Sequence, residues 1–342
     1  MSCPAACRAD CTPAEALPDA YRAWVWRGSA APCGLVLETV ARPALEAGQV
    51  LVRNAVIGLN PVDWKLLAGQ FMSGRPGKVP GLDGAGTVVA VGEGVSADWL
   101  GRRVAYHQSL ERPGSFAQYT PLAAEVLIRL PAALDFATAA AFPCPALTAW
   151  QALEKVSALP GDELLISGAG GSVGHYLVQL AAARGFVVSV MCHARHRERL
   201  YALGASEWLG GPLAESENWA DWGPARFHAV IDCVSAAHAE RLAPAVLANG
   251  HLVCIQGRVA RWPDAPFGRA LSLHEVALGA LHRFGDRAAW QRLTDAGEAL
   301  LRALAEGRLQ AEAALVGEFA ELPQRLLALQ HRQFSGKALI RV

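Results

Sequence analysis

The stretch ELLISGAGGSVGHYLVQL, residues Glu163–Leu180, has the order of a buried strand, a glycine turn and an apolar helix. Its glycines lie close to the spacing G-x-G-x-x-G, which they do not match fully. A turn without Cβ atoms lets the backbone approach a pyrophosphate, and the free N–H groups that begin the helix favour a negative charge. The residues predicted to bind a cofactor here are Gly168, Gly170, Gly171, Ser172, Val173 and Gly174. A tight strand–helix turn without a ligand is the alternative that this stretch alone leaves open.

The same turn also matches G-x-S-x-G, the nucleophile elbow of α/β-hydrolases, in residues Gly170–Gly174. Ser172 would then be a nucleophile that needs an acid and a histidine on loops after later strands. Asp232 ends a predicted strand, as the acid should, whereas His251 begins one, and His274 is the other nominee. No HGGG-type oxyanion segment precedes the serine. We therefore disfavour a hydrolase.

After this turn, predicted strands and helices alternate along the chain. Alternation of this kind is typical of β-α-β units, whose strands form a parallel sheet. The expected strands are Glu163–Ser167, Phe186–Met191, Phe227–Asp232 and His251–Gln256. The expected helices are Ser172–Arg184, Arg195–Leu203 and Ala236–Leu247.

The chain on either side of this alternation has a different texture. From Tyr21 to about Arg129, glycines and prolines separate short apolar runs, which predicts a compact and mostly β module. The Ala- and Leu-rich stretch Ala132–Glu154 predicts two helical pieces broken by Pro143 and Pro145. The clearest strands of the first module are Val50–Ile57, Val88–Val91 and Arg103–Tyr106. The C-terminal part predicts helices at Ala288–Glu306 and Leu322–His331, with strands at Leu315–Phe319 and Ala338–Val342.

The composition restricts the class of protein. Of the 342 residues, 31 are Lys or Arg and 31 are Asp or Glu, so the formal net charge is zero. The 52% hydrophobic content excludes a disordered chain, and the zero net charge disfavours a nucleic-acid partner. No apolar run approaches the roughly 18 residues of a membrane span, and the first twenty residues lack the pattern of a signal peptide. Eight cysteines without a C-x-x-C pair fit a reducing compartment, so we expect a cytoplasmic protein with no membrane partner.

The end of the second predicted strand indicates which coenzyme is bound. In turns that bind NAD, an acid about 20 residues beyond the glycines hydrogen-bonds the adenosine ribose 2′-OH. Here the strand runs into MCHARHR, residues Met191–Arg197, and no acid precedes Glu198. The basic residues His193, Arg195 and His196 suit the 2′-phosphate of NADP(H), although alone they would be read as a solvated helix start. Together with the glycine turn, they favour NADP(H) as the cofactor.

Five further motifs follow one another in a characteristic order. They are Gly58–Lys65 (GLNPVDWK), Pro80–Val88 (PGLDGAGTV) with Val91-Gly92 after it, Gly114–Tyr119 (GSFAQY), Ala146–Trp150 (ALTAW) and Gln333–Lys337 (QFSGK). With the glycine turn, they resemble the medium-chain dehydrogenase/reductases, in the zinc-free branch of quinone oxidoreductases and enoyl or alkenal reductases. The resemblance spans about Tyr21 to the C-terminus, and this set of motifs is more specific than the glycines alone.

The resemblance implies an α/β fold with two domains. One is a GroES-like, β-rich catalytic domain closed by the C-terminus, expected at residues 21–145 and 285–342. The other is an inserted Rossmann NADP-binding domain, a doubly wound parallel sheet, expected at residues 146–284. Residues 1–20, with Cys3, Cys7 and Cys11, are expected to be a poorly ordered extension. Relatives are commonly homodimers through the edge of the Rossmann sheet, which implies a homodimer with His251–Gln256 as the pairing strand.

Four more cofactor contacts are expected, Thr148 and Arg332 from the resemblance and Gln256 and Gly257 from their place in the predicted sheet. Thr148 is expected to contact the nicotinamide, with a helix residue that bonds its own backbone as the alternative. Gln256 and Gly257 close a strand at the carboxyl edge of the sheet, where ligands bind in such sheets. Arg332 would reach the 2′-phosphate from the C-terminal segment.

No metal is expected. Zinc-dependent members of the family place a Cys in the first motif and a His-Glu pair in the second, because Zn²⁺ prefers thiolate and imidazole ligands. This chain has Asn60–Lys65 in the first motif and Gly81-Leu82-Asp83 in the second, and no Cys lies between Gly101 and Tyr119. His107 is expected to be a loop residue rather than a ligand.

The resemblance implies hydride transfer from NADPH to a small electrophilic acceptor, a quinone or an α,β-unsaturated carbonyl. Lys65 is the first candidate to act on the acceptor, because its ammonium can stabilise a developing enolate. Asn60 and Asp63 are expected to organise the floor of the pocket. A pairing of Asp63 with Lys65, and a surface role for Lys65, are the alternatives. A different class stays open, namely an NADPH-binding sensor, structural protein or trans-acting partner with little turnover.

Overall fold

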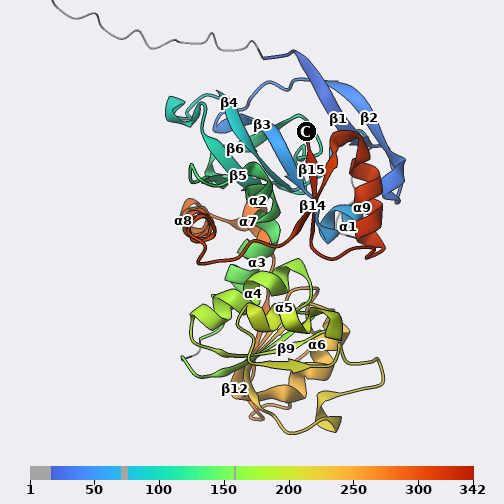
Figure 1. The fold of residues 1–342 in the computed structure, drawn as a ribbon, viewed down its shortest axis with the longest axis vertical. Helices are drawn as coiled ribbons and strands as arrows, with labels where there is room; N and C mark the ends of the chain where they lie inside the picture. The colour runs from blue at the N-terminus through green and yellow to red at the C-terminus, as the bar shows by residue number, and fades with distance from the viewer. Residues whose placement is uncertain (1–16, 71–75, 158) are drawn as a thin grey trace, which may run out of the picture.

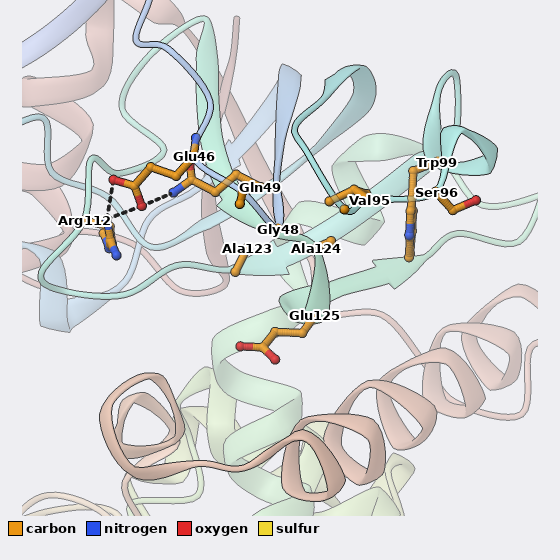
Figure 2. A pocket seen from close by; sticks show the side chains of 12 residues that line it. Glu46, Gly48, Gln49, Val95, Ser96, Trp99, Arg112, Ala123, Ala124 and Glu125 are labelled. Atoms are coloured by element: carbon orange, nitrogen blue, oxygen red, sulfur yellow. Dashed lines mark hydrogen bonds and ion pairs between the residues drawn. The ribbon is translucent and has the colours of Figure 1, made fainter.

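The computed structural model describes residues 17–70, 76–157 and 159–342. Figure 1 shows two bodies, one above the other, which the chain joins through α3 (Pro143–Leu153). The expected boundary at residues 145 and 146 falls inside this helix, and the domain bounds stay a prediction. Cys3, Cys7 and Cys11 lie outside the described residues.

A six-stranded parallel sheet forms the lower body, in the order β10-β9-β8-β11-β12-β13. The winding starts at β8, moves outward through β9 and β10, and then resumes on the other side of β8 with β11. Its strands are β8 (Glu163–Ser167), β9 (Val187–Met191), β10 (Glu207–Leu209), β11 (Phe227–Asp232), β12 (Val246–Cys254) and β13 (Ser272–Glu275). In doubly wound sheets, ligands bind at the carboxyl edge where the winding reverses. The glycine turn follows β8 directly and therefore lies at this point.

Helices connect the strands of this sheet (Figure 1). They are α4 (Ser172–Ala183), α5 (Arg197–Ala202) and α6 (Ala236–Leu242). Along α4, Tyr176, Leu177, Val178 and Ala181 are buried, which gives the helix an apolar face toward the sheet. The predicted strand–turn–helix order of residues 163–180 is therefore confirmed.

The upper body contains a seven-stranded sheet in the order β14-β15-β3-β4-β5-β7, with β6 paired to β3. The C-terminal strand β15 pairs antiparallel with β3, so the end of the chain completes a sheet that the first half begins. The strands are β3 (Gln49–Gly58), β4 (Asp83–Val91), β5 (Arg103–His107), β6 (Tyr119–Ala123), β7 (Leu127–Arg129), β14 (Ala314–Glu318) and β15 (Lys337–Arg341). The helices are α1 (Pro61–Leu67), α2 (Phe136–Ala141), α7 (Leu281–Phe284), α8 (Arg287–Ala305) and α9 (Leu322–Gln330), and β1 (Ala20–Trp26) with β2 (Leu35–Ala41) forms a separate antiparallel ribbon.

One hydrophobic core runs through both bodies. It includes Tyr106 of β5, Leu147 of α3 and Val190 of β9, all buried. The rings of Phe142 and Tyr176 meet edge to face across the junction, with centroids 6.3 Å apart. Because α3 and α4 pack together in this core, the glycine turn is held in a fixed relation to the upper sheet.

The structure corrects the predicted pairing strand. Residues 251–254 belong to β12, which lies between β11 and β13 in the interior of the sheet. Beyond β12 the sheet ends at β13, Ser272–Glu275, a strand that the sequence pattern did not indicate, and the opposite edge is β10. Its sequence SLHE contains one apolar residue, which is too little for a recognisable strand pattern.

Several element boundaries also differ from the predictions. Pro143 begins α3, and Pro145 does not break the helix because a proline in the first turn removes no helical hydrogen bond. The helix α6 ends at Leu242, where Pro244 turns the chain into a 3₁₀ segment. The motif Gly114–Tyr119, which resembles a strand of the family, forms a loop over residues 114–118, and β6 begins at its last residue, Tyr119.

Candidate active site

The glycine turn has a shape that requires glycine at its two ends. Gly168 has a φ of +67°, which L side chains rarely adopt. A Cβ atom on Gly174 would lie 2.2 Å from the carbonyl oxygen of Ala169, so only glycine lets α4 start this close to its strand. A Cβ atom on Gly171 would meet no atom nearer than 3.9 Å. The turn thus leaves open space beside Gly171, at the start of α4, where the residues fit a pyrophosphate.

Arg199 of α5 holds this turn in place, although no sequence pattern indicated it as a site residue. Its Nη2 donates to the carbonyl oxygen of Gly170 at 2.8 Å, and its Nη1 donates to Nδ1 of His175 at 3.0 Å. The other ring nitrogen of His175, Nε2, donates to the carbonyl oxygen of Gln310 at 2.8 Å. A histidine that accepts at one nitrogen and donates at the other is neutral, and burial lowers the pKa of His175 to about 4.

The three predicted 2′-phosphate residues lie together at the end of β9. His193 accepts the backbone N–H of Arg195 at its Nδ1, 3.1 Å away. The guanidinium Nε of Arg195 donates to Nε2 of His196 at 3.0 Å. His196 also lies against the glycine turn, since a Cβ atom on Gly170 would be 2.4 Å from its Cδ2. Burial lowers the pKa of His196, and the neighbouring charge of Arg199 adds to this effect.

Lys65 reaches across the two bodies. Its Nζ donates to Oε1 of Gln256 at 2.6 Å, which joins α1 to the residue two positions after β12. Gly257 follows with a φ of +97°. Burial lowers the pKa of the Lys65 ammonium, and the charge of Arg332 lowers it further. The carboxyl edge of the parallel sheet thus brings together Lys65, Gln256 and Arg332. The expected contact of Arg332 with a 2′-phosphate stays a prediction.

Asn60 and Asp63 form part of a buried polar network. The backbone N–H of Asn60 donates to Oδ2 of Asp63 at 2.7 Å, which caps α1. The side chain of Asn60 donates to Asp83 at 2.8 Å and accepts from Lys337 at 2.5 Å. Asp63 does not pair with Lys65, because its Oδ1 has no partner and the lysine binds Gln256. The alternative pairing of Asp63 with Lys65 is therefore wrong.

Asp83 is the carboxylate at the centre of this network, and it lies beside His107 and Lys337. His107, which ends β5 and is buried rather than in a loop, has its Nδ1 2.9 Å from Oδ1 of Asp83. The backbone N–H of Cys144 donates to Oδ2 at 3.0 Å, and the Lys337 ammonium lies 3.7 Å from the same oxygen. Neither Lys337 nor Asp83 was predicted from the sequence as a site residue.

The side chains of Asp83, His107 and Cys144 could in principle hold a metal, because their ligand atoms lie within 4.8 Å of one another. Two features oppose this. Burial raises the pKa of the Cys144 thiol, which must lose its proton to bind zinc. The buried Lys337 ammonium already neutralises Asp83 and would repel a divalent ion. This donor set fits an ammonium group better than Zn²⁺, and no other group of three ligands was found among the described residues.

Thr148 and Ser172 lie on the two helices at the junction. Thr148 is buried on α3, one turn after Cys144, whose thiol it hydrogen-bonds. Ser172 and Val173 are the first residues of α4. Asp232 accepts from the hydroxyl of Ser167 and from Nδ1 of His238, and not from a histidine next to Ser172. Of the other hydrolase nominees, His251 contacts Ser157 and His274, so the described contacts form no triad with Ser172.

Replacing Asp63 by asparagine tests the buried network. Burial raises the pKa of the Asp63 carboxyl to about 8, against the opposing effect of the Asn60 N–H group. Because this pKa is raised in the folded state, the contribution of Asp63 to the free energy of unfolding is fully present below about pH 4. That contribution is lost as the pH rises toward about 8. Between these limits, the free energy of unfolding should fall by about 1.4 kcal/mol per pH unit relative to Asp63→Asn. Denaturant unfolding from pH 4.5 to pH 8 measures this difference.

Asp221 offers a matched control, because it forms the same capping box with Asn218 at an exposed turn. Asp221→Asn therefore shows how much of the stability difference comes from losing the cap itself rather than from burial of the carboxyl. A constant difference between Asp63→Asn and the wild-type protein across this range would contradict the account.

Comparison with known proteins places this architecture. Residues 46–132 match the alcohol dehydrogenase GroES-like domain. A chloroplast envelope quinone oxidoreductase homolog from Arabidopsis thaliana is 32% identical over 242 residues, which cover 68% of this chain and 74% of the relative. This chain belongs to the medium-chain dehydrogenase/reductase superfamily. Within the superfamily it falls in the quinone-oxidoreductase-like branch, and it is an oxidoreductase.

Two further comparisons agree with this assignment. An NADPH-dependent alkenal/one oxidoreductase from Arabidopsis thaliana is 30% identical over 256 residues, which cover 71% of this chain and 64% of the relative. The crystal structure of an alcohol dehydrogenase superfamily protein from Novosphingobium aromaticivorans superposes with a TM-score of 0.81. It is 28% identical and covers 94% of this chain and 99% of that chain. The predicted GroES-like domain with a Rossmann-like parallel sheet is therefore confirmed.

One finding concerns the membrane. Among the residues that the structure describes, none of the helices is both long enough and apolar enough to cross a bilayer. The expected cytoplasmic location stays a prediction.

Proposed function

We propose that this medium-chain dehydrogenase/reductase transfers hydride from NADPH to a quinone or an α,β-unsaturated carbonyl without a metal. The hydrogen bond between Lys65 and Gln256 is the observation that carries the proposal most directly. It brings an ammonium group to the carboxyl edge of the parallel sheet, on the side where the glycine turn follows β8. A positive group there is suited to an acceptor that becomes negatively charged on oxygen.

The cofactor residues of the proposal are those of the turn, the end of β9 and the junction. The open space beside Gly171 and the N-terminus of α4 would hold the pyrophosphate. His193, Arg195 and His196 would bind the 2′-phosphate, in agreement with the name of the alkenal/one oxidoreductase relative, which specifies NADPH. Thr148 and Gln256 would position the nicotinamide, which supplies the hydride when bound.

Lys65 is proposed to act on the acceptor. The Lys65 ammonium is partly buried, and its hydrogen-bond partner is the neutral side-chain amide of Gln256. The contact with Gln256 therefore leaves its positive charge without a neutralising carboxylate. When negative charge develops on the acceptor oxygen, a desolvated ammonium stabilises it more strongly than water would. Asn60 and Asp63 are proposed to hold α1, and with it Lys65, in place through the capping box.

The acceptor class follows from what surrounds Asn60. A zinc-dependent alcohol dehydrogenase stabilises an alkoxide with a Lewis acid at this position. Here the corresponding side chains bind the Lys337 ammonium, so the chain's own donors fit a conjugated acceptor, whose charge spreads onto an oxygen. The relatives named as quinone oxidoreductase and as alkenal/one oxidoreductase support both acceptor classes.

A homodimer through β13 is part of the proposal. One of the two edges of the parallel sheet is β13, and the loop before it exposes Trp262 to 63% and Phe267 fully. An unpaired strand edge flanked by exposed aromatic residues favours pairing with a second copy. Light scattering should give the mass of two chains, and the mass of a single chain would contradict this part.

Turnover with a panel of acceptors tests the proposed function. Metal-depleted protein should oxidise NADPH in the presence of quinones or enones, and saturated ketones and alcohols should give no comparable rate. Tight NADPH binding without turnover on any acceptor would instead indicate a binding protein. Restoration of turnover only by added Zn²⁺ would contradict the metal-independent part.

A further inference from the structure

Hydrogen bonds hold the segment between α8 and β14 along α4, the helix that follows the glycine turn. The carbonyl oxygen of Gln310 accepts from Nε2 of His175 at 2.8 Å and from the Gln179 amide at 3.2 Å. The backbone N–H of Gln310 donates to Oε1 of Gln179 at 2.7 Å. These three bonds hold Glu312, two residues later, against the first turn of α4.

Glu312 is a buried carboxyl at that helix start. Only 7% of the residue is exposed, its side chain forms a hydrogen bond with the Ser172 hydroxyl, and its Oε2 is buried without a partner. Burial raises the pKa of the Glu312 carboxyl. The Ser172 hydroxyl and the charges of Lys337 and Arg199 oppose this rise without cancelling it.

The groups that face Glu312 come from three elements. Tyr176 faces it from α4 together with Ser172, Arg199 faces it from α5, and Lys337 faces it from β15. Neither cation neutralises Glu312 alone. Lys337 lies near Asp83 and donates to Asn60, while Arg199 binds the Gly170 carbonyl and His175. The Glu312 carboxyl therefore has one hydroxyl donor, and the two cations near it also serve other groups. Its Oε2 has no partner, so it can donate a hydrogen bond when it carries a proton.

A dinucleotide at this helix start would bring the negative charge of its pyrophosphate close to this carboxyl. Two negative groups in a buried site repel, and the one with the higher proton affinity takes up a proton. We propose that Glu312 binds one proton from solvent when NADP(H) binds, and that its neutral O–H donates a hydrogen bond at the pyrophosphate end of α4. The inference rests on the proposed function and adds to it a pH-dependent control of coenzyme affinity by a residue of the C-terminal segment.

Titration of coenzyme binding against pH tests this inference on the full chain. Fluorescence titration gives the Kd for NADPH and for NADH from pH 5.5 to pH 9, in the wild type and in Glu312→Gln. The wild-type affinity should fall by up to about tenfold per pH unit once the pH exceeds the pKa of Glu312, because each binding event must then import a proton. Glutamine is neutral at every pH, so the variant should lose this slope. NADH lacks the 2′-phosphate, so it separates the effect of Glu312 from effects at the 2′-phosphate site.

Calorimetry counts the proton directly. Calorimetry of NADH binding in two buffers with different ionisation enthalpies should report uptake of close to one proton per wild-type chain above that pKa. Glu306→Gln is the matched control, since Glu306 lies at the end of α8 and pairs with Arg308 at the surface. That control should keep both the slope and the proton uptake.

The outcomes separate the two levels of the argument. Binding with the same pH slope in wild type and Glu312→Gln, or without proton uptake, would overturn the inference and leave the proposed function intact. Absence of NADPH binding to either protein at any pH would overturn the proposed function itself.

Discussion

Replacing Lys65 by alanine should lower kcat on enones by about 100- to 1,000-fold and leave the Kd for NADPH nearly unchanged. The magnitude is that of removing one preorganised donor from a developing oxyanion. We expect kcat to fall because Lys65 lies at the carboxyl edge of the parallel sheet, where its Nζ binds Gln256. The ammonium is partly desolvated at this position. Steady-state kinetics with a saturating enone, together with a fluorescence titration of NADPH, measure the two quantities.

Two variants show whether the effect belongs to the charge of Lys65. Lys155→Ala removes a lysine near His274 on the parallel-sheet body and should leave kcat unchanged. Lys65→Met keeps the length of the side chain and should be as impaired as the alanine variant. Unchanged turnover in Lys65→Ala would eliminate the proposed role.

Replacing both Arg195 and His196 by alanine should raise the Kd for NADPH by about 100-fold or more and spare NADH. Hydrogen bonds to a charged group contribute about 1.5–3 kcal/mol each, and only NADPH carries the 2′-phosphate. The two side chains touch each other beside the glycine turn, so one phosphate can contact both. Parallel fluorescence titrations with the two coenzymes measure the ratio.

Arg197 supplies the control for this experiment. It lies next to the cluster but pairs with Glu198 at 2.9 Å, so Arg197→Ala should change neither affinity much. An equal loss of NADPH and NADH in the double variant would show that it damages the turn rather than the recognition of the 2′-phosphate.

Local sequence patterns predicted the parallel-sheet body closely. The apolar run before Gly168 and the apolar face after it identify β8 and α4 with nearly correct ends, because both depend on nearby residues. The short edge strand β13 was missed, because its pairing with β12 supplies what its own sequence lacks. For the same reason β12 was taken for an edge strand, since the order of strands is set by packing and not by sequence order.

The site residues that belong to recognisable motifs were predicted. Those that only tertiary contacts bring to the site were missed. Lys65 and Gln256 were both nominated, although nothing in their local sequence indicates that they touch across 191 positions. Glu312 was not nominated, because an isolated glutamate between two elements gives no pattern. Lys337 was noticed only as part of a closing motif, since its partner Asn60 is 277 positions away.

Transfer of a labelled hydride tests the central claim most directly. Metal-depleted protein would be mixed with an enone and NADPH that carries deuterium at the transferable position of the nicotinamide, and the product analysed by mass spectrometry. The account predicts one deuterium per reduced enone molecule at the β-carbon, at a rate that added Zn²⁺ does not raise. Product without deuterium, or product formed only after zinc is restored, would contradict it.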